Sequence, residues 1–94
     1  LIIEKTQLIG YNYYMPTVAQ ENGFSLIIRT RDHEPPHVHV WKNKKEMLFY
    51  LGSENERPSL RENKGMTQKE ALDAFKLVCK YQEELLSKWK EIYG

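Results

Sequence analysis

All three histidines of the chain lie within seven residues, at His33, His37 and His39, beside the carboxylates of Asp32 and Glu34. Side chains two apart on a β-strand point to the same side. A strand through His37 and His39 would therefore place their imidazoles together, with Cα atoms about 6–7 Å apart. Neighbouring imidazoles on an accessible surface can hold a metal ion, exchange protons with a substrate or contact a partner. The chemistry of this protein is expected at this cluster.

A metal site is one interpretation of the cluster. His33, His37 and His39 would be the ligands, with Asp32 as the alternative to His33 in the proline-stiffened loop before the strand. Imidazole nitrogen and carboxylate oxygen suit Zn²⁺ and other divalent transition metals. A divalent transition metal is thus the one cofactor that the residues suggest, and no ligand cluster elsewhere in the chain adds to it.

Acid–base catalysis is a second interpretation. A histidine pair at His37 and His39 can donate and accept protons near neutral pH, because imidazole has a reference pKa of about 6.5. Cleavage of RNA can proceed in this way without a metal, with Arg29 or Arg31 stabilising the phosphate charge. The chain would then be a small ribonuclease-like toxin, and the residues alone leave open whether it is an enzyme.

Binding without catalysis is the third interpretation. Trp41 shares the predicted face of His37 and His39, and together with His33, Arg29 and Arg31 it can stack a base and hold phosphates. In the alternative without a functional site, the histidines and Trp41 lie on a sheet face and have no binding or catalytic role. The arginines would then pair with nearby carboxylates at positions 32, 34 or 46.

The hydropathy pattern predicts the elements that would position these side chains. Alternating apolar residues predict strands over residues 23–31, 37–42 and 46–51, and a short fourth strand over 59–62. Turns are predicted at 21–23 and 43–45, because Asn and Gly favour turns.

A period of 3.6 replaces this alternation in the last third of the chain. Thr67 and Glu70 have the spacing of a capping box, and apolar residues then recur every three or four positions to Tyr93. This stripe predicts one long helix that needs a sheet face to cover it. The predicted fold is α+β, a three- to four-stranded antiparallel β-meander packed against one long C-terminal α-helix.

Composition limits the class of protein. The chain has 94 residues, of which 40% are hydrophobic and 29% charged, with a net charge of +1. These values favour one compact domain, over residues 15–94, and do not by themselves indicate nucleic acid. The single cysteine, Cys79, excludes an internal disulfide, and no apolar run approaches the roughly 18 residues of a membrane span. We therefore expect a cytoplasmic protein without membrane contact.

Residues 1–14 are interpreted separately as an N-terminal extension. They combine apolar residues with Tyr11, Tyr13 and Tyr14, which suits an extra edge strand, or they are a sequence added for expression. An exposed aromatic edge at Tyr11–Tyr14 would let the chain pair with a second copy of itself.

The sequence resembles a family of bacterial proteins, the domain-of-unknown-function family 4160. The resemblance covers residues 15–94, and its motifs are MPT at 15–17, GF at 23–24, DHEPPHVHV at 32–40, ENKG at 62–65 and QEELLSKW at 82–89. Members commonly begin at the Met-Pro-Thr, so residues 1–14 depart from the pattern. The resemblance implies a small cytoplasmic α+β protein, often encoded beside another small protein as in toxin–antitoxin pairs. It implies no activity, and places His33, His37 and His39 in the family signature.

The leading functional expectation combines these observations. The protein is expected to be a component of a toxin–antitoxin-like module that binds a protein partner or nucleic acid, RNA or DNA, through its histidine-bearing sheet face. The partner would be a small co-encoded protein or a second copy of the chain. The ribonuclease-like toxin and the metal-binding protein are the alternatives.

Overall fold

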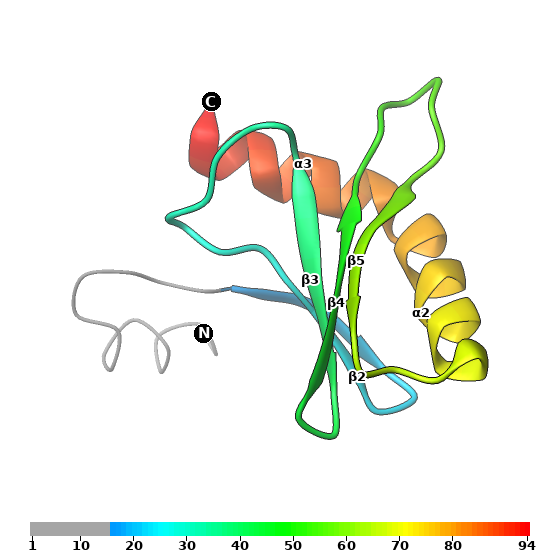
Figure 1. Ribbon diagram of the computed structural model, residues 1–94. Helices are drawn as coiled ribbons and strands as arrows, with labels where there is room; N and C mark the ends of the chain where they lie inside the picture. Colours follow the sequence, from blue (N-terminus) through cyan, green and yellow to red (C-terminus); the bar gives the residue numbers. More distant parts are fainter. Residues whose placement is uncertain (1–15) are drawn as a thin grey trace.

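The computed structural model describes residues 16–94, which form a five-stranded antiparallel sheet and two helices (Figure 1). The strand order β1-β2-β3-β4-β5 is a meander. The elements are β1 (Thr17–Glu21), β2 (Phe24–Ile27), β3 (His37–Lys42), β4 (Lys45–Tyr50), β5 (Ser59–Lys64), α2 (Gln68–Lys80) and α3 (Gln82–Tyr93). The predicted α+β class and antiparallel meander are confirmed, although the sheet has five strands rather than three or four.

The turn between β3 and β4 fixes the register that the site depends on. Asn43 and Lys44 both have positive φ, 49° and 66°, as in the hairpin turns whose twist matches that of the flanking strands. The pairing that follows places Trp41 opposite Glu46 and His39 opposite Leu48. The turn predicted here from the sequence is confirmed.

The strands differ from the sequence prediction at several boundaries. β4 begins and ends one residue earlier than predicted, and β5 extends to Lys64. The larger differences are at β1 and β2. β1 is an additional strand, which alternation does not indicate because none of its residues is fully buried. It is held by antiparallel pairing with β2, with a register shift between Thr17 and Ala19. β2 ends at Ile27 instead of Arg31, so residues 28–36 leave the sheet as a loop. This loop carries Arg29 and Asp32 across to the start of β3.

The single long helix of the prediction is wrong, because α2 and α3 are separate helices that meet at Tyr81 (Figure 1). The Tyr81 hydroxyl donates a hydrogen bond to Glu21 at 2.7 Å. Nε2 of Gln82 lies 2.7–3.0 Å from three carbonyl oxygens of the β4–β5 loop. The predicted capping box of Thr67 and Glu70 is confirmed at the start of α2. Within residues 16–94, no helix combines the length and apolarity needed to cross a membrane.

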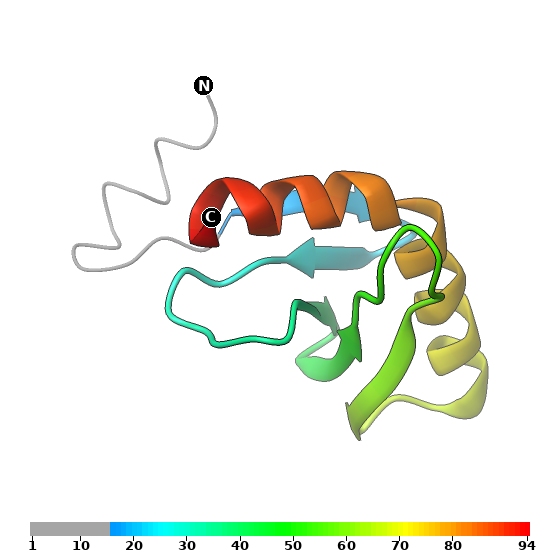
Figure 2. The ribbon, with the colours of Figure 1, turned by 90° about the horizontal axis from the view of Figure 1, so that it is seen from above.

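The helices cover one face of the sheet, and the hydrophobic core lies between the two layers (Figure 2). Leu26, Val40 and Phe49 project into this core from β2, β3 and β4, and Leu77 and Leu85 meet them from α2 and α3. Because side chains alternate along a strand, the neighbours of Val40 on β3 point to the other face. The histidines of β3 are therefore on the face away from the main core.

Residues 1–14, predicted as an N-terminal extension, lie outside the described residues. The aromatic edge predicted at Tyr11–Tyr14 lies there as well.

Candidate functional site

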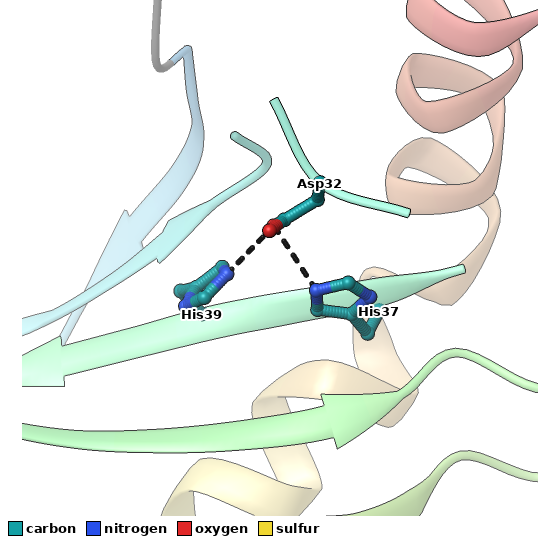
Figure 3. A group of neighbouring side chains, drawn as sticks. All are labelled: Asp32, His37 and His39. Carbon is teal, nitrogen blue, oxygen red and sulfur yellow. Dashed lines mark hydrogen bonds and ion pairs between the residues drawn. The ribbon is translucent and has the colours of Figure 1, made fainter. Parts of the chain in front are cut away.

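Asp32 bridges the two histidines of β3. Its Oδ2 lies 3.0 Å from Nε2 of His37 and 2.9 Å from Nε2 of His39 (Figure 3). The strand supplies the two rings from one face, with centroids 5.3 Å apart, and the loop of residues 28–36 brings the carboxylate down onto them. The expectation that His37 and His39 project together is confirmed.

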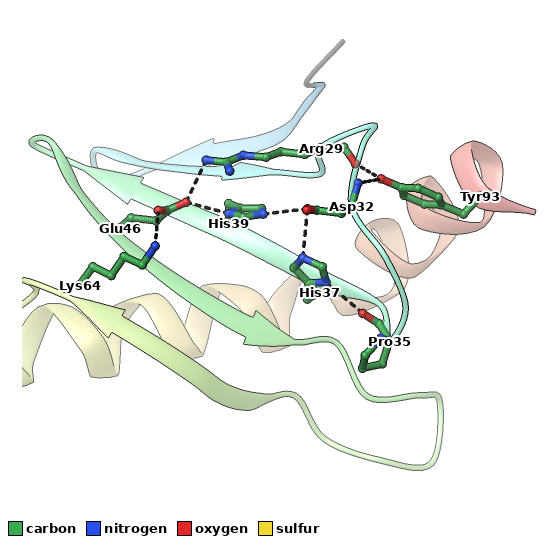
Figure 4. Close-up of polar contacts among 8 residues, drawn as sticks. All are labelled: Arg29, Asp32, Pro35, His37, His39, Glu46, Lys64 and Tyr93. Atoms are coloured by element: carbon green, nitrogen blue, oxygen red, sulfur yellow. Dashed lines mark hydrogen bonds and ion pairs between the residues drawn. The ribbon is translucent and has the colours of Figure 1, made fainter. Parts of the chain in front are cut away.

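The second nitrogen of each ring also has a partner (Figure 4). Nδ1 of His37 lies 2.9 Å from the carbonyl oxygen of Pro35, and Nδ1 of His39 lies 2.7 Å from Oε2 of Glu46. A carbonyl or carboxylate oxygen only accepts hydrogen bonds, so both Nδ1 atoms donate. We call Asp32, His37, His39 and Glu46 the histidine cluster.

The histidine cluster is buried, which corrects the expectation of accessible imidazoles. His37 is 2% exposed and His39 4%. Both lie on β3, the central strand of the sheet, where the loop of residues 28–36 covers them and the indole of Trp89 packs 5.3 Å from the His37 ring. The side chain of Asp32, 22% exposed, is the more accessible part of the triad that it forms with the two rings.

Tyr93 holds the loop of residues 28–36 in place from α3. Its hydroxyl donates to the carbonyl oxygen of Arg29 and accepts from the backbone N–H of Asp32 at 2.8 Å (Figure 4). Both contacts are to backbone atoms, so they position the loop whatever its side chains do. The end of α3 thus sets where the Asp32 carboxylate lies.

Electrostatics favour an ionised Asp32. Partial burial opposes its ionisation, but the hydrogen bond from His39 and the charges of His37, His39 and Arg29 outweigh this effect and lower the pKa of Asp32.

Glu46 connects the buried cluster to the exposed part of the same face. Besides His39, it contacts Nη2 of Arg29 at 3.1 Å and Nζ of Lys64 at 3.7 Å. The Arg29 guanidinium in turn lies 6.0 Å from the ring of Trp41. The alternative in which Arg29 pairs with a nearby carboxylate is confirmed, with Glu46 as that carboxylate.

The other predicted site residues are not members of the histidine cluster. His33 is exposed on the loop and is not part of the group whose ligand atoms converge, which consists of Asp32, His37 and His39. Arg31 is exposed on the same loop, beyond the end of β2. Trp41 is 39% exposed on the sheet face. The metal set of three histidines is therefore replaced by the alternative in which Asp32 takes the place of His33.

Sequence reasoning gave no site role to Glu46, Tyr93 or Trp89. Glu46 could have been found from the hairpin register, since a two-residue turn at positions 43–44 places it opposite Trp41 and diagonal to His39. Tyr93 and Trp89 gave no such signal, because they reach the site only through the packing of α3 over the end of β3.

The arrangement limits what the cluster can do chemically. All four ring nitrogens of His37 and His39 face oxygen atoms of the protein within 3.0 Å. None is directed at a space where a substrate would lie, so this geometry gives no support to acid–base catalysis. The ligand atoms of Asp32, His37 and His39 lie within 4.8 Å of one another, close enough to share one metal ion.

Comparison with known proteins identifies the family. The sequence model described as "Domain of unknown function (DUF4160)" matches residues 23–90, a range that contains the whole histidine cluster. Neither the curated proteins nor the solved structures contain a significant match to this chain. The family match confirms the resemblance noted in the sequence, and the chain belongs to the DUF4160 family.

Proposed function

We propose that this protein binds single-stranded nucleic acid, as one component of a toxin–antitoxin-like module, through the exposed part of the sheet face that carries the histidines. We call this surface the Trp41 face and define it by the exposed or partly exposed side chains of Arg29, Trp41, Tyr50, Arg61 and Lys64. The observation that carries the proposal is Trp41, which is 39% exposed on β3 with the Arg29 guanidinium 6.0 Å from its ring.

The Trp41 face combines the two features that bind single strands. Exposed aromatic rings stack on bases of any sequence, and cations follow the phosphate backbone. A second pair repeats the pattern, since the guanidinium of Arg61 lies 5.8 Å from the ring of Tyr50. Trp41 and Tyr50 lie on the same face of the β3–β4 hairpin, so one strand of nucleic acid can run across both rings.

Charge on this face also favours an anionic ligand. Arg29, Arg61 and Lys64 supply three cations. Two carboxylates share the face: Glu46, whose side chain is only 14% exposed beneath two of the cations, and the exposed Glu62, which lies opposite Leu48 on β4. These five side chains carry one more positive than negative charge, which favours an anionic ligand.

Binding is favoured over cleavage by the state of the histidines. His37 and His39 are buried, and their ring nitrogens are engaged by the protein. The ribonuclease-like alternative needs at least one of these rings to reach a phosphodiester. The place of the protein in a toxin–antitoxin-like module is supported by the family resemblance, in which a second small protein is often encoded alongside.

Fluorescence anisotropy with short labelled RNA and DNA, single-stranded and duplex, tests the proposal. We expect the native protein to prefer single strands, with affinity that falls as salt rises. Trp41→Ala should weaken binding about tenfold or more, as expected for the loss of one stacked base. Leu72→Ala is the matched control, because Leu72 is a 53% exposed apolar residue on α2, away from the sheet face, and it should bind like the native protein.

The remaining outcomes separate the alternatives. RNA recovered intact after incubation agrees with binding alone, whereas cleavage that disappears in His39→Ala would favour the ribonuclease. Absence of nucleic-acid binding, together with Trp41-dependent copurification of the co-encoded protein, would assign the face to a protein partner. Equal binding by native protein, Trp41→Ala and Leu72→Ala would contradict the proposal.

A further inference from the structure

We propose that Oδ2 of Asp32 and Nε2 of His37 and His39 form a binding site for one divalent transition metal ion of the Zn²⁺ type. This site goes beyond nucleic-acid binding, because it lies under the loop of residues 28–36 and apart from the exposed rings of the Trp41 face.

The ligand atoms converge as a metal requires. Oδ2 of Asp32 lies 3.0 and 2.9 Å from the two Nε2 atoms, and all three atoms lie within 4.8 Å of one another (Figure 3). Ligands about 2.0–2.2 Å from a tetrahedral Zn²⁺ are separated by roughly 3.2–3.6 Å. The two distances from Oδ2 of Asp32 to the Nε2 atoms would each have to lengthen by a few tenths of an ångström to admit the ion.

The outer nitrogens are already arranged as in metal sites. Histidines that bind metal ions almost always donate the hydrogen of the other ring nitrogen to a carboxylate or a backbone carbonyl, which fixes the tautomer and the ring orientation. His39 donates from Nδ1 to Glu46, and His37 donates from Nδ1 to the carbonyl of Pro35. Because Glu46 and the carbonyl of Pro35 occupy the Nδ1 atoms, Nε2 of each ring is the nitrogen directed at Asp32.

This arrangement brings three electron-pair donors together. A neutral ring with its hydrogen on Nδ1 presents a lone pair at Nε2, as Oδ2 of Asp32 does, whereas a protonated ring donates from Nε2 to Asp32. Lone pairs 3 Å apart repel unless a cation lies between them. Additional protons on the rings would serve this purpose in a purely structural cluster, and a metal ion would serve it in a binding site. The experiment below distinguishes these two cases.

The donor set selects the class of metal. Two imidazole nitrogens and one carboxylate oxygen suit Zn²⁺, Co²⁺ or Ni²⁺, whereas Mg²⁺ and Ca²⁺ prefer sites made of oxygen alone. Among the described residues, the converging group supplies three ligands. Three protein ligands are typical of sites that leave a coordination position for water or another donor.

Metal analysis and calorimetry of untagged, chelator-treated protein test the site. We expect one Zn²⁺ per chain and no competition from Mg²⁺. Asp32→Asn and His39→Gln should weaken Zn²⁺ binding at least 100-fold, and Glu46→Gln, which alters only the partner of Nδ1, about 10–100-fold. His33→Ala is the matched control, since His33 lies next to Asp32 but outside the group, and it should bind Zn²⁺ as the native protein does.

Two results would overturn the site. One is substoichiometric Zn²⁺ in the native protein, and the other is native affinity in both Asp32→Asn and His39→Gln. If these variants do not fold, the site is tested by fluorescence in the variant Trp41→Phe. Trp89 is then the only tryptophan, and its indole lies 5.3 Å from the ring of His37. Saturable quenching of Trp89 fluorescence by Co²⁺, reversed by Zn²⁺, supports the site, and a folded protein without quenching refutes it.

Discussion

The indole of Trp89 packs against the imidazole of His37, with ring centroids 5.3 Å apart and the ring planes tilted by 52°. Trp89 also lies 4.2 Å from the ring of Tyr93, so the last turns of α3 place two aromatic rings over the start of β3. This contact joins the hydrophobic core to the histidine cluster. Stability of the fold and geometry of the cluster are therefore linked at Trp89.

Trp89→Ala is the substitution that tests this link. Trp89 is 4% exposed, and removal of a buried indole is expected to lower the free energy of unfolding by about 3–5 kcal/mol. Trp41→Ala is the matched control, because Trp41 is 39% exposed and its loss should change the same quantity by about 0.5 kcal/mol or less. Urea unfolding followed by circular dichroism measures both, and equal losses would mean that Trp89 is not the anchor.

Tyr93→Phe isolates the hydroxyl that holds the loop of residues 28–36. The phenylalanine keeps the stacking on Trp89 but removes the hydrogen bonds with the backbone of Arg29 and Asp32. We expect a loss of about 0.5–1.5 kcal/mol in the free energy of unfolding.

Amide hydrogen exchange gives a local readout for Tyr93→Phe. The N–H of Asp32 donates to the Tyr93 hydroxyl and should exchange faster in the variant. The N–H of Leu51 donates instead to the carbonyl of Pro36, and it should keep its protection after correction for global stability. Unchanged exchange at Asp32 would show that other contacts position the loop.

Those parts of the fold that depend on neighbouring residues could be predicted from the sequence. The capping box of Thr67 and Glu70 needs only one helical turn, and the turn at Asn43 needs only two positions. The break between α2 and α3 could not be predicted in this way. It occurs at Tyr81 without Gly or Pro, and the contacts that hold it come from Glu21, about 60 residues earlier, and from the β4–β5 loop around Gln82.

The candidate site also has features that could be predicted from neighbouring residues and features that depend on distant contacts. The period of a strand is enough to place His37 and His39 together. Their burial depends on how residues 28–36 fold back over β3, which pattern alone does not determine. Glu46 follows from the hairpin register, whereas Tyr93 contacts Asp32 from 61 residues away.

Among the glycines of residues 16–94, Gly52 is the one at which a side chain should be least tolerated. It has φ +71°, and a Cβ there would lie 2.4 Å from the carbonyl oxygen of Glu56 and 2.7 Å from that of Arg57. Gly52→Ala should therefore combine the cost of a left-handed backbone, about 1–2 kcal/mol, with about 1–3 kcal/mol for displacing the loop backbone.

Gly23→Ala is the matched control for Gly52→Ala. Gly23 has a similar φ of +83°, but its Cβ would meet only the flexible Lys42 side chain, at 3.5 Å. In thermal or urea unfolding, Gly23→Ala should lower the free energy of unfolding only by the cost of the left-handed backbone. If the two variants were equally destabilised, the close approach at Gly52 would have no energetic consequence.

Glu70 should make the fold sensitive to acid. Its carboxylate accepts hydrogen bonds from Nζ of Lys45 at 2.7 Å and from the backbone N–H of Thr67 at 2.9 Å, and mainly the lysine lowers the pKa of Glu70 to about 2. The unfolded chain has the ordinary value of about 4.3, so it takes up the proton first as the pH falls. The stabilisation is therefore complete above about pH 4.5 and is lost between that pH and about 2.

Glu70→Gln tests this dependence, because the amide oxygen can still accept from Thr67 while the charge that attracts Lys45 is absent. At neutral pH the variant should be less stable than the native protein, and the difference in the free energy of unfolding should shrink as the pH falls from 4.5 towards 2. Asp73→Asn is the control, since Asp73 meets the 84% exposed Lys69 and its loss should cost less than about 0.5 kcal/mol at neutral pH. A Glu70→Gln deficit that stayed constant down to pH 2 would show that the Lys45–Glu70 pair does not link α2 to β4 electrostatically.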